Sequence, residues 1–149
     1  MQPKRRRQAR STTSHHSDSC EDHLERIAEL VEAKGYARVT DVAEALGIRP
    51  SSVSNMIRRL ATRGLVNYER YRGFTLTPEG RAVANRIKAR HETLTEVFSL
   101  MGLDAEAVAD EVEDIEHHLR PQTLKLLGKL ATYWKSHPAQ LKSFREFAG

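Results

Sequence analysis

Carboxylate and imidazole side chains are concentrated in residues 111–118, which read EVEDIEHH. On a helix, Glu113, Glu116 and His117 occupy positions i, i+3 and i+4, so the three side chains project from one face. Grouped carboxylates make one another harder to ionise unless a cation lies between them. Two carboxylates and one imidazole on one face therefore predict half of a divalent-metal site.

Two other groups of residues can supply further donors to such a site. Asp22 and Glu25 are three residues apart on a predicted helix, and His91 lies on the otherwise apolar stripe of another. Taken singly, each has an ordinary explanation: a solvated face, a partner of the helix dipole or a hydrogen-bonded core histidine. Their joint presence favours a metal site. Oxygen and nitrogen donors without a thiolate suit Mn²⁺ or Fe²⁺, although Zn²⁺ and Co²⁺ would also bind.

Other histidines and the lone cysteine are not expected to ligate a metal. His15, His16 and Cys20 fall in a segment without predicted secondary structure and are too few for a tetrahedral zinc shell, so we expect them to be exposed to solvent. His118 points about 100° away from His117 around a helix and is left out of the ligand set.

A second set of polar and basic residues suits DNA. Gly47 and the two residues after it separate two short predicted helices by the spacing of a helix-turn-helix. The second helix of that motif presents its N-terminal residues to base edges in the major groove, where asparagine can pair with adenine and serine can bond to bases or phosphates. Arginines one turn later, or in a following hairpin, are suited to phosphates or the minor groove. The predicted DNA-binding residues are Ser51, Ser52, Ser54, Asn55, Arg58, Arg59, Arg70 and Arg72.

Hydrophobic spacing predicts the elements that would hold these side chains. Apolar residues recur every three or four positions in most of the chain, and Gly, Pro or Thr stands at the expected ends. Thr77 is a predicted N-cap, with Pro78 as the first helical residue. The predicted helices span about 20–34, 39–46, 50–63, 77–101, 104–119 and 121 onward, with a short one in the last dozen residues, and a hairpin spans 65–76.

These elements predict a mainly α fold with three parts. A disordered basic tail over residues 1–19 precedes a winged helix-turn-helix DNA-binding domain over 20–76, whose wing is the short hairpin. An all-helical domain follows over 77–149, and it begins with the long linking helix 77–101. That helix carries a narrow apolar seam typical of helices that pack against a partner.

Charge and composition agree with two different binding functions. The formal net charge of +4 divides into +4 for residues 1–19, +4 for residues 20–90 and −4 for residues 91–149. A single cysteine excludes a disulfide framework, and no apolar run approaches the roughly 18 residues that cross a bilayer, so we expect a soluble cytoplasmic protein without a signal peptide or membrane partner. A basic front can approach DNA, whereas an acidic rear needs cations.

From about Cys20 to Trp134 the sequence resembles the diphtheria toxin repressor family, and specifically its manganese transport regulator branch. The resemblance rests on four stretches in the order helix-turn-helix, wing, long helix and metal segment. They read EAKGYARVTDVAEALGIRPSSVSNMIRRL, YERYRGFTLTPEG, KARHE around His91, and DEVEDIEHHL.

The resemblance implies a manganese-responsive repressor of metal-uptake genes that binds double-stranded operator DNA as a metal-activated homodimer and so controls metal homeostasis. It implies two Mn²⁺ ions per subunit and assigns residues 77–149 as the dimerisation domain. The branch's ligand pattern is similar to Asp22, Glu25, His91, Glu113, Glu116 and His117. Iron-responsive relatives tend to carry sulfur ligands where this chain has Asp22 and Glu116, which favours manganese. Longer relatives end in an SH3-like domain, for which 149 residues leave no room.

Three other interpretations remain to be weighed. An iron-responsive regulator of the same family is disfavoured by the ligand types. A winged-helix regulator that senses an organic ligand would leave the acidic cluster as a solvated face. A di-iron oxidase is not expected, because such enzymes carry two Glu-x-x-His pairs and this chain has none, nor does it contain HExxH. We therefore predict that the protein is not an enzyme.

Overall fold

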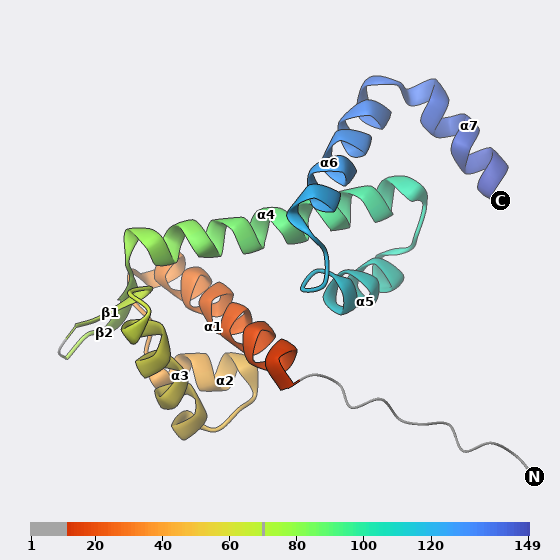
Figure 1. Cartoon of the computed structure of the whole chain (residues 1–149). Coiled ribbons are helices and arrows are strands. Elements are labelled where there is room, and N and C mark those ends of the chain that lie inside the picture. Colours follow the sequence, from red (N-terminus) through yellow and green to blue (C-terminus); the bar gives the residue numbers. More distant parts are fainter. Residues whose placement is uncertain (1–11, 70) are drawn as a thin grey trace, which may run out of the picture. The chain divides into compact units, whose positions relative to one another are not determined.

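The computed structural model describes residues 12–69 and 71–149 and is mainly helical (Figure 1). The chain divides into two compact units inside the long helix, between Arg81 and Ala82, whereas the sequence suggests a boundary between residues 76 and 77. No helix in the described ranges is both long and apolar enough to cross a membrane. The elements in chain order are α1 (Thr12–Lys34), α2 (Val39–Leu46), α3 (Pro50–Thr62), β1 (Val66–Glu69), β2 (Gly73–Leu76), α4 (Pro78–Met101), α5 (Ala105–Ile115), α6 (Pro121–Ser136) and α7 (Pro138–Ala148).

Helices α2 and α3 of the first unit form the predicted helix-turn-helix. Helix α2 ends at Gly47, whose φ of 64° is left-handed and lets the chain turn sharply, as glycine does at many helix ends. Pro50 then begins α3 at a position where its missing N–H costs nothing. The apolar face of α3 is fully or almost fully buried and consists of Val53, Met56, Ile57 and Leu60.

The start of α2 is fixed by Asp41. Its carboxylate accepts a hydrogen bond from the backbone N–H of Arg38 at 3.1 Å and one from the Lys34 ammonium at 2.6 Å. The hydrogen bond from Lys34 is the main reason that the pKa of Asp41 lies below its ordinary value. The ionised carboxylate thus serves the first turn of α2 and ties it to the end of α1.

The hairpin that follows α3 is the predicted wing. Strands β1 and β2 pair antiparallel, from Val66 opposite Leu76 to Glu69 opposite Gly73. Phe74 is 1% exposed, and its backbone exchanges two hydrogen bonds of 2.9 Å with that of Ala37, in the segment between α1 and α2. The base of the wing is therefore built into the core of the first unit.

Helix α4 begins as its sequence predicts. The Thr77 hydroxyl accepts a hydrogen bond from the Gly80 N–H at 2.9 Å, which identifies Thr77 as the N-cap. The same hydroxyl donates to the Gly64 carbonyl oxygen at 2.6 Å. Thr77 thus fastens the start of α4 to the turn between α3 and the wing.

The second unit has two apolar clusters along α4. Leu94, Val108 and Val112 form the first and join α4 to α5. The second joins α4 to α6 and α7 and consists of Val97, Ala131 and Trp134, with Leu141 and Phe144 packed against them. The Arg145 guanidinium of α7 also donates to two carbonyl oxygens at the end of α4, those of Ser99 at 3.0 Å and Leu100 at 2.8 Å.

Three expectations from the sequence are corrected. Helix α1 begins at Thr12 rather than near Cys20, so part of the expected tail, residues 12–19, is helical, while residues 1–11 lie outside the described ranges. Helix extension beyond an existing turn costs little, which explains the longer helix despite its polar sequence. Cys20 is not exposed, because it is 5% accessible and its Sγ accepts a hydrogen bond from Arg63 at 3.1 Å.

The helix expected over residues 104–119 ends at Ile115. Residues 116–118 form a turn, and Arg120 is extended with ψ of 147°. The chain leaves the helix through a tighter turn, in which the His118 N–H donates to the Ile115 carbonyl oxygen at 2.9 Å. Pro121 then holds Arg120 in an extended conformation. The final short helix is confirmed as α7.

Candidate metal centre and DNA-reading surface

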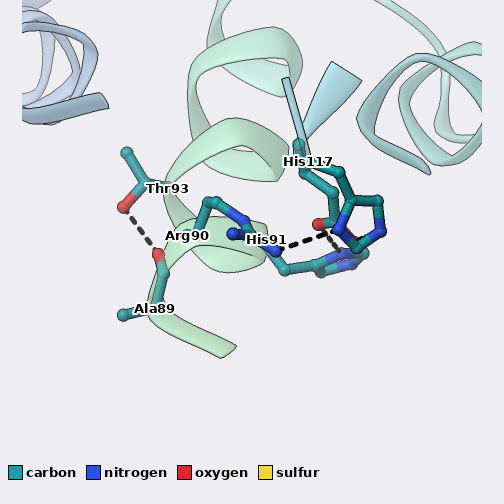
Figure 2. Close-up of polar contacts among 6 residues, drawn as sticks. Ala89, Arg90, His91, Thr93 and His117 are labelled. Carbon is teal, nitrogen blue, oxygen red and sulfur yellow. Dashed lines mark hydrogen bonds and ion pairs between the residues drawn. The ribbon is translucent and has the colours of Figure 1, made fainter. Parts of the chain in front are cut away.

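Three of the predicted metal ligands meet in the second unit. The Glu116 carboxylate is 3% exposed, with Oε2 lying 2.9 Å from His91 Nδ1 and Oε1 lying 3.5 Å from His117 Nε2. We call His91, Glu116 and His117 the His–Glu cluster; Figure 2 labels its two histidines. A buried carboxylate is costly unless it is paired, and here two imidazoles flank it. One oxygen-donor group and two nitrogen donors, without sulfur, suit a divalent cation of the Mn²⁺ or Fe²⁺ type.

The apolar core beside the cluster sets its geometry. Leu94 follows His91 by three residues on α4, and Val112 precedes Glu116 by four at the end of α5; both are fully buried in the same apolar cluster. Because residues three or four apart share a helix face, packing of these two side chains turns His91 and Glu116 towards each other. The core thus positions the donors.

Arg90 adds a cation that the sequence analysis did not assign. Its Nη2 lies 3.3 Å from His117 Nδ1 (Figure 2). A guanidinium has donors but no acceptor, so Nδ1 is the acceptor in this hydrogen bond. The contact joins residues 27 apart in sequence. The only local sign of it is that Arg90 stands next to His91.

The other three predicted ligands are not part of the His–Glu cluster. Glu113 is exposed on α5, and Asp22 and Glu25 are partly exposed on α1, in the first unit. Among the residues that the structure describes, no group of three or more His, Cys, Asp or Glu side chains is arranged to hold a metal ion. The structure brings His91, Glu116 and His117 into contact with one another. The complete set of six ligands stays a prediction. His118 is exposed.

The predicted base-reading residues lie at the start of α3. Ser51, Ser52 and Asn55 are exposed and Ser54 is partly exposed, on the side of α3 away from its buried stripe. Asn55 Oδ1 accepts a hydrogen bond from Arg58 Nη1 at 3.4 Å. The asparagine amide is thus solvent-accessible, as pairing with a base edge requires.

The predicted phosphate-binding arginines are exposed where they are described. Arg58 and Arg59 lie one turn after Asn55 on α3, and Arg72 lies in the wing, while Arg70 falls outside the described residues. The wing also exposes two tyrosines that the sequence analysis did not single out, Tyr68 at 72% and Tyr71 at 85%. Tyrosine is an ordinary strand residue, so its type alone gave no signal of this exposure.

Two family models match the chain, one over the DNA-binding part and one over the part that follows it. The model of the iron dependent repressor N-terminal DNA binding domain matches residues 15–74, and that of the iron dependent repressor metal binding and dimerisation domain matches residues 77–145. The HTH-type transcriptional regulator MntR of Oceanobacillus iheyensis is 41% identical over 128 residues, which cover 86% of this chain and 87% of the relative. The family resemblance stated from the sequence is thereby confirmed.

Solved structures agree in fold. The T. acidophilum IdeR structure matches with a TM-score of 0.64 and 31% identity over 80% of this chain. The manganese regulator SloR matches with a TM-score of 0.66 and 28% identity over 76%. This chain spans 54% of the length of each of those two solved chains. With a DNA-binding domain followed by a metal-binding and dimerisation domain, the chain belongs to the iron dependent repressor family of transcriptional regulators and is not an enzyme.

Proposed function

We propose that this protein is a manganese-responsive transcriptional repressor that acts on operator DNA in the cytoplasm as a homodimer. The observation that carries the choice of metal is the buried Glu116 carboxylate between His91 and His117, a donor set with no sulfur. Hard oxygen donors favour Mn²⁺ over softer metals. The relative named MntR and the solved manganese regulator SloR support the same choice. Iron is the second candidate, because both matching family models are described as iron dependent.

The proposed ligands are the six residues that the sequence indicates, which hold two metal ions per subunit. They are Asp22, Glu25, His91, Glu113, Glu116 and His117. Asp22 and Glu25 belong to the part of the chain that carries the helix-turn-helix, and the other four belong to the dimerisation domain. A bound divalent ion supplies positive charge that lets the carboxylates share one site.

Because the proposed ligands come from both the helix-turn-helix part and the dimerisation domain, metal binding can control the affinity for DNA. Two recognition helices of a dimer must enter successive major grooves, about 34 Å apart. If Asp22 and Glu25 are tied to the dimerisation domain, fewer separations of the two helices are accessible and less entropy is lost on binding DNA. Ser51, Ser52, Ser54 and Asn55 then read bases, and Arg58, Arg59, Arg70 and Arg72 hold phosphates.

Operator binding tests this function directly. A labelled palindromic duplex is titrated with the full chain in chelator, Mn²⁺, Fe²⁺ or Zn²⁺ at one fixed salt concentration, and fluorescence anisotropy gives the affinity. We expect Mn²⁺ to tighten binding by at least about tenfold, within the usual range of coupling between two sites. Equal affinity in chelator and in Mn²⁺ would favour a regulator that senses an organic ligand. A larger response to Fe²⁺ would make iron the signal.

Replacing Asn55 with alanine is expected to weaken binding to the operator by about tenfold, because a bidentate contact to a base contributes roughly 1–3 kcal/mol. Affinity for a scrambled duplex of equal length should be unchanged, since phosphate contacts remain. Anisotropy with both duplexes measures the two affinities.

Arg59→Ala is the matched control for Asn55→Ala. Arg59 is exposed on α3 and is assigned to phosphate, so its loss should weaken binding to both duplexes alike and reduce the salt dependence. Equal losses on both duplexes for Asn55→Ala would contradict base reading at that position.

A further inference from the structure

The contact between Arg90 and His117 places a permanent positive charge beside the His–Glu cluster. Arg90 Nη2 lies 3.3 Å from His117 Nδ1, and the His117 side chain is 9% exposed, so little water screens the contact. Figure 2 shows the guanidinium and the His117 ring facing each other, with Arg90 and His91 adjacent on α4. Because arginine stays protonated at all ordinary pH values, its charge persists whatever the state of the cluster.

Arg90 opposes the binding of a metal ion to either ring nitrogen of His117. A metal ion that takes the Nδ1 lone pair must displace the hydrogen bond from Arg90, because that lone pair already accepts it. A metal ion that binds Nε2 instead leaves the guanidinium on the Nδ1 side of the same ring. In both cases a divalent charge and a guanidinium come close beside side chains that are 3% and 9% exposed, those of Glu116 and His117, where repulsion is stronger than in water.

We propose that Arg90 is a built-in competitor of the metal ion, which lowers the affinity of the His–Glu cluster and so raises the metal concentration at which the protein becomes loaded. This inference rests on the proposed function, since it assumes that the cluster binds Mn²⁺. With Arg90 present, the protein would respond only at a higher Mn²⁺ concentration than the same ligands would require without the guanidinium.

The opposite role would be support of the ligand. A hydrogen bond from outside the first coordination sphere often orients a histidine and strengthens metal binding, so its loss costs about 10-fold to 100-fold in affinity. The two roles predict changes of opposite sign when the guanidinium is removed. A measurement of affinity therefore separates them.

The test is a titration of the full-length protein with Mn²⁺ in the absence of DNA, in which the electron paramagnetic resonance signal of the free ion reports binding. Arg90→Gln keeps a hydrogen-bond donor but removes the charge, and we expect Mn²⁺ to bind about tenfold more tightly. Arg90→Lys keeps a positive charge, so its affinity for Mn²⁺ should stay closer to that of wild type than to that of Arg90→Gln. Arg86→Gln removes one charge from an exposed position one turn earlier on α4 and should also change little.

Thermal unfolding followed by circular dichroism provides a second readout. Saturating Mn²⁺ should raise the melting temperature of Arg90→Gln by more than that of wild type, since a ligand stabilises in proportion to the logarithm of its affinity. Unchanged or weaker Mn²⁺ binding by a folded Arg90→Gln protein, with wild type still binding, overturns the inference alone. Absence of Mn²⁺ binding by wild type overturns the proposed function and this inference together.

Discussion

Glu116→Gln is expected to weaken Mn²⁺ binding by at least about 100-fold and to remove the response of operator binding to the metal. The substitution keeps the size of the side chain but removes the buried charge between His91 and His117. A 100-fold loss corresponds to about 2.7 kcal/mol, which is a reasonable loss when a buried charged ligand is replaced by a neutral one. Free-ion titration measures the affinity, and anisotropy measures operator binding in chelator and in Mn²⁺.

The Glu116→Gln protein should still fold. The glutamine amide oxygen can accept the hydrogen bond from His91, so this contact of the buried side chain is kept. Glu111→Gln is the matched control, because Glu111 is exposed on α5, the helix that Glu116 follows, and its loss should change affinity by less than about twofold. Full Mn²⁺ affinity in a folded Glu116→Gln protein would exclude Glu116 as a ligand and leave the acidic segment as a solvated surface.

Much of the fold was predictable because its signals are local. Gly47 and Pro50 mark the two ends of the helix-turn-helix turn, and Thr77 caps α4, all within a few residues of the feature that they determine. The apolar stripe of α3 is buried as its spacing predicts. The exact ends of α1 and α5 were missed, since helix extension into polar sequence costs little and the last turn of a helix often tightens.

The candidate site was predictable only in part. Glu116 and His117 are neighbours in sequence, and His91 stood out as a polar residue on an apolar stripe, so residue type and spacing revealed all three. Arg90 could not be assigned in the same way, because its contact with His117 depends on how α4 and α5 pack. The burial of Cys20 against Arg63 was missed for the same reason, as those residues are 43 positions apart.

Gly80→Ala is expected to destabilise the protein by about 3 kcal/mol. A Cβ atom at residue 80 would lie 1.9 Å from the Leu65 carbonyl oxygen and 2.8 Å from its carbonyl carbon. Both are backbone atoms in the turn that leads to the wing, and Thr77 fastens the start of α4 to the same turn through Gly64. Relief therefore requires α4 and the wing to separate, and overpacking of this kind typically costs 1–3 kcal/mol. Urea denaturation of the full chain, followed by circular dichroism, measures the loss.

Gly128→Ala separates this steric effect from the general effect of replacing a helical glycine. A Cβ at residue 128 would lie 3.6 Å from Thr93 Cγ2, an ordinary contact distance. Because alanine is the better helix former by about 1 kcal/mol, this variant should be as stable as wild type or more stable by up to that amount. The two glycines both lie inside helices, yet their variants should move the denaturation midpoint in different directions. If the free energy of unfolding of Gly80→Ala lies within about 0.5 kcal/mol of wild type, the close approach of Gly80 to the Leu65 carbonyl does not hold α4 against the turn that leads to the wing.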